Sequence, residues 1–222
     1  MRPQYSLPAP CLCLVTDRKL CGLDSLEEKV AAAVSGGVDM VQLREKDLSA
    51  GELLQLAGKL RFIIKHRALL IINDRLDVAL ATEADGLHLP EDSIAVRDAR
   101  RVVPSQLLLS KAVHNPAGAS LAAKEGADFL VLGTIFPTSS KSGVKTGGLK
   151  IITAVARLVD TPVLAIGGID SSNVASVIGA GAKGIAVISA ILGASDQEKA
   201  AREIKQSMMA AWEAPQAVSL RP

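Results

Sequence analysis

The chain has 222 residues, which fits one large domain better than two very small ones. Hydrophobic residues make up 49% of it and aromatic residues only 2%, so the core must consist of Ala, Val, Leu and Ile, as in a parallel sheet covered by helices. A formal net charge of +2 is too balanced to favour a nucleic-acid or membrane surface, and the scarcity of aromatic residues argues against base stacking.

The N-terminal region carries neither a signal-peptide pattern nor an apolar run of transmembrane length. Three cysteines, Cys11, Cys13 and Cys21, lie near this end. Their odd number and the lack of nearby metal ligands indicate free thiols. We therefore expect a cytoplasmic protein.

Short apolar runs alternate with helical stretches along the whole chain. Strands are expected at residues 12–16, 38–43, 68–72, 86–89, 107–113, 129–132, 162–166 and 184–188. Two capping boxes, Ser25 with Glu28 and Ser49 with Glu52, begin the first helices. Later helices are expected at 95–103, at 116–125, at 149–159, after an N-cap within 170–173, and up to about residue 211.

Strands that alternate with helices in this way predict a single-domain (β/α)₈ TIM barrel. It would span residues 1–222, with its core at about 11–211 and a short tail at each end. A repeat supports this fold, because Asp39, Asp85 and Asp128 each precede an even-numbered strand and Lys183 holds the fourth such place. The alternative is an open, doubly wound sheet, which a series of near-equal βα units disfavours.

The chemistry of such barrels lies at the C-terminal ends of the strands. Gln42, Arg44 and Lys46 alternate at the end of the second strand, so their side chains point the same way. One amide and two cations suit a diphosphate or another polyanion. The alternative is a solvated strand end in which Arg44 pairs with Glu45.

The loop after the sixth strand is crowded with hydrogen-bond donors and has almost no acid or base. This composition indicates a polyanion site and includes Thr138, Ser139, Ser140 and Lys141. Gly167 and Gly168 follow the seventh strand and Ser189 follows the eighth, where barrels commonly bind phosphate. The alternative here is a tight turn and an ordinary N-cap.

Carboxylates end the third and fourth strands, at Asp74 and Asp92. Beside a phosphate-rich pocket they suit Mg²⁺ bridging to a substrate. The alternatives are that Asp74 pairs with Arg75 and that Asp92 caps the fourth helix. His114 ends the fifth strand, in a good position for proton transfer.

Several motifs in this order resemble the thiamine-phosphate synthase and thiazole tautomerase barrels, from the first strand to the eighth. They include the segments 14–17, 42–46, 72–75, 84–89, 136–141, 165–169 and 187–191. In the synthase branch, 4-amino-2-methyl-5-pyrimidinylmethyl diphosphate is joined to a thiazole phosphate and diphosphate is released by a dissociative mechanism.

The resemblance implies a role for each matching residue. The catalytic residues would be Lys141, Arg44, Lys46 and His114. The pyrimidine diphosphate would contact Gln42, Arg44, Lys46, Asn73 and Lys141. Mg²⁺ would lie on Asp74 and Asp92. The thiazole phosphate would lie against Thr138, Ser140, Gly168, Ile188 and Ser189, and Ser139 would be a further substrate-binding residue.

Some positions depart from the synthase pattern. The segment from Pro90 to Asp92 is one residue shorter than in most synthases, and Ala112 stands where synthases usually have a serine. With Lys111, these features resemble the tautomerase branch, which would use His114 as acid or base. The complete set of Gln42, Arg44 and Lys46, with Asp74 and Lys141, favours the synthase.

A hypothesis of another class is a non-catalytic carrier of thiazole phosphate, which would need neither the cations of the second strand nor Asp74. In each case the expected partners are small phosphorylated molecules rather than nucleic acid or membrane. A homo-oligomer is left open.

Overall fold

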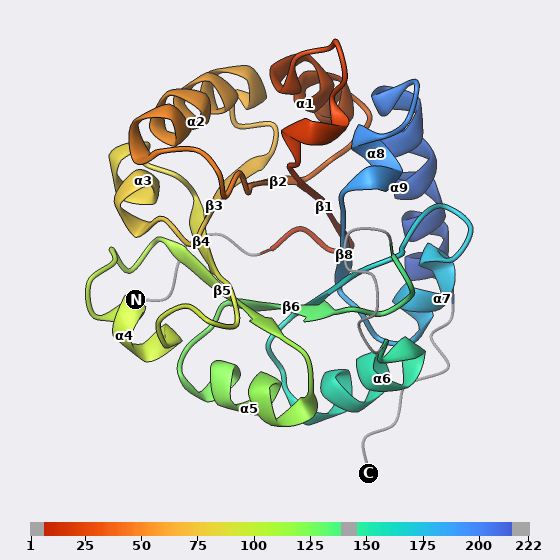
Figure 1. The fold of residues 1–222 in the computed structure, drawn as a ribbon. Coiled ribbons are helices and arrows are strands. Elements are labelled where there is room, and N and C mark those ends of the chain that lie inside the picture. The colour runs from red at the N-terminus through yellow and green to blue at the C-terminus, as the bar shows by residue number, and fades with distance from the viewer. Residues whose placement is uncertain (1–6, 139–145, 215–222) are drawn as a thin grey trace.

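The computed structural model describes residues 7–138 and 146–214. Eight parallel strands form a closed barrel in sequence order, and β1 pairs with β8. Figure 1 shows the strands as the inner ring and the helices as the outer one. The TIM-barrel prediction is therefore confirmed, and the open sheet is excluded.

The strands are β1 (Cys11–Val15), β2 (Met40–Leu43), β3 (Leu69–Asn73), β4 (Gly86–Leu89), β5 (Leu108–Val113), β6 (Phe129–Gly133), β7 (Val163–Ile166) and β8 (Gly184–Val187). The helices are α1 (Leu26–Ser35), α2 (Ala50–Ile64), α3 (Leu76–Ala81), α4 (Val96–Arg100), α5 (Pro116–Lys124), α6 (Gly148–Leu158), α7 (Val174–Gly179), α8 (Ser189–Leu192) and α9 (Gln197–Glu213), with a 3₁₀ turn η1 (Arg18–Leu20).

Both predicted capping boxes are present. Ser25 and Glu28 exchange side-chain-to-backbone hydrogen bonds of 3.1 Å at the start of α1, and Ser49 with Glu52 does the same for α2. Other ends differ from expectation. Helix α4 is shorter than the predicted 95–103, and the short α8, beside α9 in Figure 1, was not predicted.

The core has two layers, because successive strand side chains point alternately into the barrel and out toward the helices. Cys11, Cys13, Met40 and Phe129 belong to the inner layer and are 0–1% exposed. The cysteines are free thiols, as predicted. Burial raises the pKa of Cys13 to about 12, so this thiol stays protonated and inert at neutral pH.

The repeated aspartates have a structural role at the opposite end of the barrel from the strand C-termini. Asp128 Oδ2 accepts a 2.7 Å hydrogen bond from the Leu109 N–H of the preceding strand and a 2.6 Å bond from Arg100 of α4. One carboxylate thus joins two strands and a helix, and we name this unit the aspartate clamp. The clamp recurs with Asp39, Leu12 and Lys205, and with Asp85, Leu70 and Arg61.

The fourth place of the repeat works differently. Lys183 donates its backbone N–H to Val163 O at 2.8 Å, and its ammonium lies 4.8 Å from the centroid of the Trp212 ring. A cation–π contact with α9 therefore stands where the other repeats have a carboxylate.

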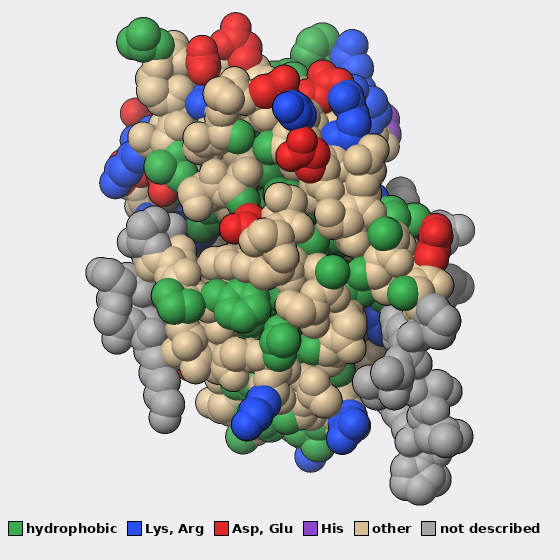
Figure 2. All heavy atoms as spheres, turned by 90° about the vertical axis from the view of Figure 1, so that its right-hand side faces the viewer, with side chains coloured by type: hydrophobic (Ala, Val, Ile, Leu, Met, Phe, Trp, Pro, Cys, Tyr) green, Lys and Arg blue, Asp and Glu red, His purple; other side chains and the backbone are tan. Residues whose placement is uncertain are grey.

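The outer surface carries mixed charge. On the side where α7 to α9 lie, Figure 2 shows acidic side chains mainly toward the upper edge, basic ones at the upper and lower edges, and hydrophobic ones in small groups. Across the described residues, no helix is both long and apolar enough to span a membrane.

We expect Asp128→Ala to lower the free energy of unfolding by about 1.5–3 kcal/mol, because the Leu109 N–H loses a charged acceptor and Arg100 loses its partner. Urea denaturation measures this loss. Asp98→Ala is the matched control, since its ion pair with Arg101 is exposed and should cost at most about 0.5 kcal/mol. Equal losses in the two variants would contradict the clamp.

Candidate functional site

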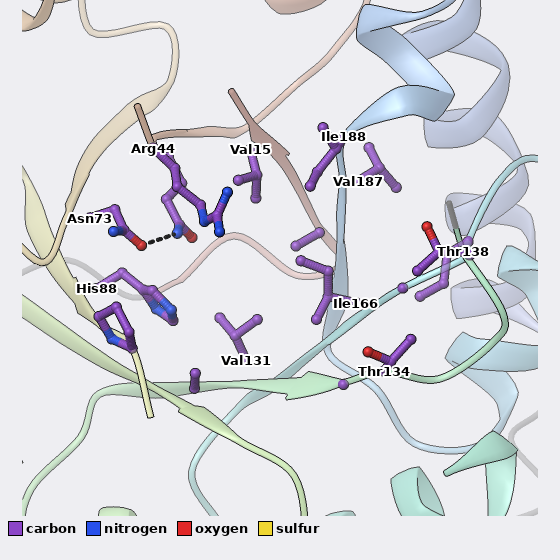
Figure 3. A pocket seen from close by; sticks show the side chains of 18 of the residues that line it. Val15, Arg44, Asn73, His88, Val131, Thr134, Thr138, Ile166, Val187 and Ile188 are labelled. Carbon is purple, nitrogen blue, oxygen red and sulfur yellow. Dashed lines mark hydrogen bonds between the residues drawn. The ribbon is translucent and has the colours of Figure 1, made fainter. Parts of the chain in front are cut away.

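A cavity of about 460 Å³ lies at the C-terminal ends of the strands, within the size range of small-molecule sites. Figure 3 shows two polar walls separated by apolar side chains. The predicted site residues that line it are Gln42, Arg44, Lys46, Asn73, Asp92, His114, Thr138, Gly168, Ile188 and Ser189. Sequence reasoning thus selected residues that the fold brings together, while Ser139, Ser140 and Lys141 lie outside the described residues.

The apolar floor was not predicted. It consists of Val15, Val131, Ile166 and Ala186, which come from β1, β6, β7 and β8. All four belong to or pack against the inner layer of the core. They continue the two-residue alternation of the inner layer, since Val15, Val131 and Ile166 each follow an inward residue by two places. This floor offers a ring-shaped ligand an apolar surface without a charge.

The first wall holds two amides in fixed orientation. Gln42 Nε2 donates to Asn73 Oδ1 at 3.2 Å, and both side chains are largely buried (Figure 3). The bond leaves the carbonyl oxygen of Gln42 and the amino group of Asn73 for other partners. One acceptor and one donor therefore stand side by side at the ends of β2 and β3.

His88 of β4 points into the barrel, a direction that the sequence did not determine. Its Nδ1 lies 2.8 Å from Ser110 Oγ on β5. Burial, followed by the positive charges of Lys111 and Arg44, lowers the pKa of His88 to about 3. The imidazole is neutral at physiological pH and serves as a hydrogen-bonding group rather than as a cation.

Arg44 and Lys46 bring positive charge to the same wall. The Arg44 N–H donates to Thr16 Oγ1 at 2.9 Å, which fixes the backbone at the end of β2. The predicted alternative, a pair of Arg44 with Glu45, is wrong, because Glu45 accepts bonds from the backbone and guanidinium of Arg18. Within residues 7–138 and 146–214, neither Arg44 nor Lys46 forms a salt bridge.

The opposite wall is built on a glycine turn after β7. Gly167 and Gly168 have φ of 106° and 63°, and a Cβ on Gly168 would lie 2.5 Å from Pro137 O. Only glycine fits this left-handed, close-packed turn. Asn173 Nδ2 donates to Gly168 O at 2.9 Å, so this N-cap residue secures the turn instead of capping α7 with its side chain.

Helix α8 begins at Ser189, beside the glycine turn. Ile188 provides no side-chain cap for it. The first N–H groups of a helix lack partners within the helix, and barrels commonly direct them at a phosphate after their last two strands. Thr138 adds a hydroxyl to this wall (Figure 3).

The two carboxylates expected to bind metal differ in position. Asp92 lines the cavity, and the N-cap of α4 is Ala95, so the capping alternative is wrong. Asp74 is exposed at the end of β3 and does not line the cavity. Its alternative is wrong too, because Arg75 pairs with Asp77, with 2.9 Å between Nε and Oδ1.

These two carboxylates fit Mg²⁺ only if a substrate and water supply its other ligands. The described residues contain no group of three or more His, Cys, Asp or Glu side chains that could hold a metal ion by themselves. Two carboxylates with room for substrate oxygens and water suit Mg²⁺ bound to a phosphorylated substrate, which retains several waters and takes few protein ligands.

His114 lies between the two walls. Its Nδ1 hydrogen-bonds to Gly133 O, and its Nε2 lies 3.2 Å from Glu91 Oε2. A carbonyl oxygen only accepts, so Nδ1 carries a proton and donates it. The ring is therefore held on one side by β6 and on the other by the loop after β4.

The fold and the cavity define a barrel with the features of an enzyme for small phosphorylated substrates. A sequence model described as thiamine monophosphate synthase matches residues 12–191. The thiamine-phosphate synthases of Methanoculleus marisnigri and Roseiflexus castenholzii are 43% and 42% identical to the chain, covering 90% and 86% of it and 96% and 85% of their own lengths. The chain belongs to the thiamine monophosphate synthase family.

A solved structure agrees with this assignment. The thiamine phosphate pyrophosphorylase from Pyrococcus furiosus superposes with a TM-score of 0.84 at 35% identity, covering 90% of this chain and 96% of its own. The family resemblance inferred from the motifs is confirmed. The roles of single residues stay predictions.

The neutral state of His88 predicts a loss of stability in acid. Its pKa is about 3 in the folded protein, against an ordinary value of about 6.5 in an unfolded chain. Between pH values of about 3 and about 6.5, the imidazole is protonated in the unfolded state and neutral in the folded state. The free energy of unfolding therefore decreases as the pH is lowered, by at most about 1.4 kcal/mol per pH unit. Urea denaturation at about pH 7 and about pH 5 should show a shallower dependence in His88→Gln than in the wild type. The same dependence in both proteins would refute the assignment.

Proposed function

We propose that the protein is a thiamine-phosphate synthase, which joins 4-amino-2-methyl-5-pyrimidinylmethyl diphosphate to a thiazole phosphate and releases diphosphate. The arrangement of the cavity carries this proposal. A cationic wall and a glycine-turn wall face each other across an apolar floor (Figure 3). Two phosphorylated groups can thus bind at opposite ends while their rings meet in the middle.

The cationic wall would bind the pyrimidine diphosphate. Arg44 can donate two parallel hydrogen bonds to phosphate oxygens, and Lys46 adds a point charge. Gln42 and Asn73 bond to each other through Nε2 and Oδ1. The carbonyl oxygen of Gln42 and the amide nitrogen of Asn73 would then bind the pyrimidine, as acceptor and donor. Lys141, which follows β6 in the sequence, would assist at the diphosphate.

The opposite wall would bind the thiazole phosphate. The backbone of Gly168 and the start of α8 at Ser189 offer N–H groups, and Thr138 offers a hydroxyl. Ile188 would pack on the ring. Ser139 and Ser140 complete the set that we propose for this end.

The reaction requires charge stabilisation and no strong base. The C–O bond between the pyrimidine methylene and diphosphate breaks, and the electron pair leaves with the diphosphate. The thiazole nitrogen then gives its lone pair to the methylene cation and forms the C–N bond. Arg44 and Lys46 would stabilise the charge that develops on the leaving group, and His88 is neutral, so it adds no repulsion to a cation.

We propose that Asp74 and Asp92 hold Mg²⁺ against the diphosphate. The ion would neutralise the charge of the leaving group. The position of Asp92 at the cavity supports this role, and Asp74 would reach the ion from the neighbouring strand end.

The tautomerase hypothesis would instead assign acid–base chemistry to His114. The contacts of this ring with Gly133 and Glu91 are compatible with a proton-carrying group. The names of the relatives and the cations of the first wall support the synthase. A homo-oligomer stays an expectation.

Purified protein incubated with both substrates and Mg²⁺ should form thiamine phosphate and release diphosphate in equal amounts. Chromatography of the product and a coupled diphosphate assay measure the two. Protein without Mg²⁺ should turn over far more slowly. Turnover of the thiazole carboxylate tautomer, with no thiamine phosphate at any Mg²⁺ concentration, would sink the proposal in favour of the tautomerase.

Arg44→Met should lower kcat/KM by about 100-fold or more, because one donor to the developing charge is lost. Steady-state kinetics measure the loss, and the unfolding transition should stay in place since Arg44 forms no salt bridge with a described residue. Arg101→Met is the control, because Arg101 is an exposed arginine at the C-cap of α4 and its loss should leave kcat/KM unchanged. Equal kinetics in Arg44→Met and the wild type would show that this wall does not bind the leaving group.

A further inference from the structure

We propose that Lys111 is a positioning residue that holds the loop after β4 so that Asp92 faces the cavity. This inference deepens the proposed function, because it rests on Asp92 as a ligand of Mg²⁺. Lys111 takes no direct part in the chemistry. It acts through the backbone of residues 90–94, the segment that carries Asp92 between β4 and α4.

Lys111 approaches the loop from the side of the barrel that faces the helices. On β5, Ser110 contacts His88 inside the barrel and Ala112 lines the cavity. By alternation, the side chain of Lys111 leaves the other face of the strand, toward the helices. Its register partner is Leu89, the last residue of β4, so its stem runs directly beneath the start of the loop.

The ammonium of Lys111 meets a ring of backbone carbonyls. Nζ lies 2.7 Å from Pro90 O, and 3.3 to 3.4 Å from the oxygens of Glu91, Ser93 and Ile94. An ammonium has three rotatable donors and no acceptor, so it matches a converging set of carbonyls. The oxygens on both sides of Asp92 are drawn to one point, which fixes the backbone of Asp92 between them.

Little else orders this loop. Glu91, Asp92 and Ile94 are exposed, so the segment buries few apolar groups. Its internal backbone bond runs from Ser93 N–H to Pro90 O at 3.1 Å and forms a turn around Asp92. The loop therefore depends on the side chain of Lys111 on β5, which donates to the same Pro90 carbonyl that closes the turn.

The side chain of His114, the residue that follows β5, holds the loop on its cavity side. His114 Nε2 lies 3.2 Å from the carboxylate of Glu91, on the cavity side. The carboxylate of Glu91 thus already has His114 as its partner. Asp92 makes no hydrogen bond or salt bridge with another described residue. Of the two neighbouring carboxylates, the loop presents Asp92 to a ligand.

The test compares Lys111→Met with Lys111→Arg and with the exposed Lys124→Met, which removes the same charge from α5. Calorimetric titration with inorganic diphosphate, with and without excess Mg²⁺, gives the gain in affinity that Mg²⁺ confers. We expect this gain to fall about 10-fold or more in Lys111→Met, the usual effect of losing a group that orients a metal ligand. Lys111→Arg keeps donors for the carbonyls and should restore most of it.

Hydrogen–deuterium exchange of metal-free protein provides a readout that needs neither Mg²⁺ nor turnover. The peptide that contains Ser93 should exchange faster in Lys111→Met than in the wild type and Lys124→Met, while the strands stay protected. Unchanged exchange, or an unchanged Mg²⁺ gain, would overturn the inference and leave the proposed synthase intact. A wild-type protein that shows no Mg²⁺ gain would instead remove the metal site itself, and this inference with it.

Discussion

Closure of the parallel sheet is the constraint on which the rest of this protein depends. When β8 pairs with β1, every strand has two neighbours and each side chain must point either into the barrel or toward the helices. The inward positions near the strand C-termini then form one cavity, whichever parts of the sequence they come from. Arg44 and Ser189 are far apart in the chain and share a site only for this reason.

The same constraint separates the tasks of the molecule along the barrel axis. At one end, carboxylates accept backbone N–H groups and join strands to helices, as Asp128 does with Leu109 and Arg100. At the other, Arg44 and Lys46 form no salt bridge with a described residue and Asp92 is left to the cavity. Charges that stabilise the fold are paired, and charges proposed to bind substrate are not. An unpaired cation costs little at a solvated mouth, and it attracts an anionic substrate.

The sequence predicted what depends on local pattern. The capping boxes at Ser25 and Ser49 need only residues three apart, and apolar runs mark every strand. The rule for barrels then selected most cavity residues. It could not give the direction of His88, because a one-residue shift in the register of β4 would turn it outward. Long-range pairs were missed as well: Glu45 bonds to Arg18 rather than to its neighbour Arg44, and the carbonyls around Lys111 come from another strand's loop.

The clamp at Asp39 has a consequence for how the protein is made. Lys205 of α9 donates to Asp39 Oδ2 at 2.7 Å and to Pro10 O at 2.8 Å, so α9 is bonded to the start of the first strand. During translation, β1 and β2 leave the ribosome long before this lysine does. The first strand therefore gains its second neighbour, β8, and its charged partner only after residues 184–205 have been made. Closure of the barrel is therefore a late step in folding. Until then the incomplete sheet has an open strand edge, which could pair with other chains.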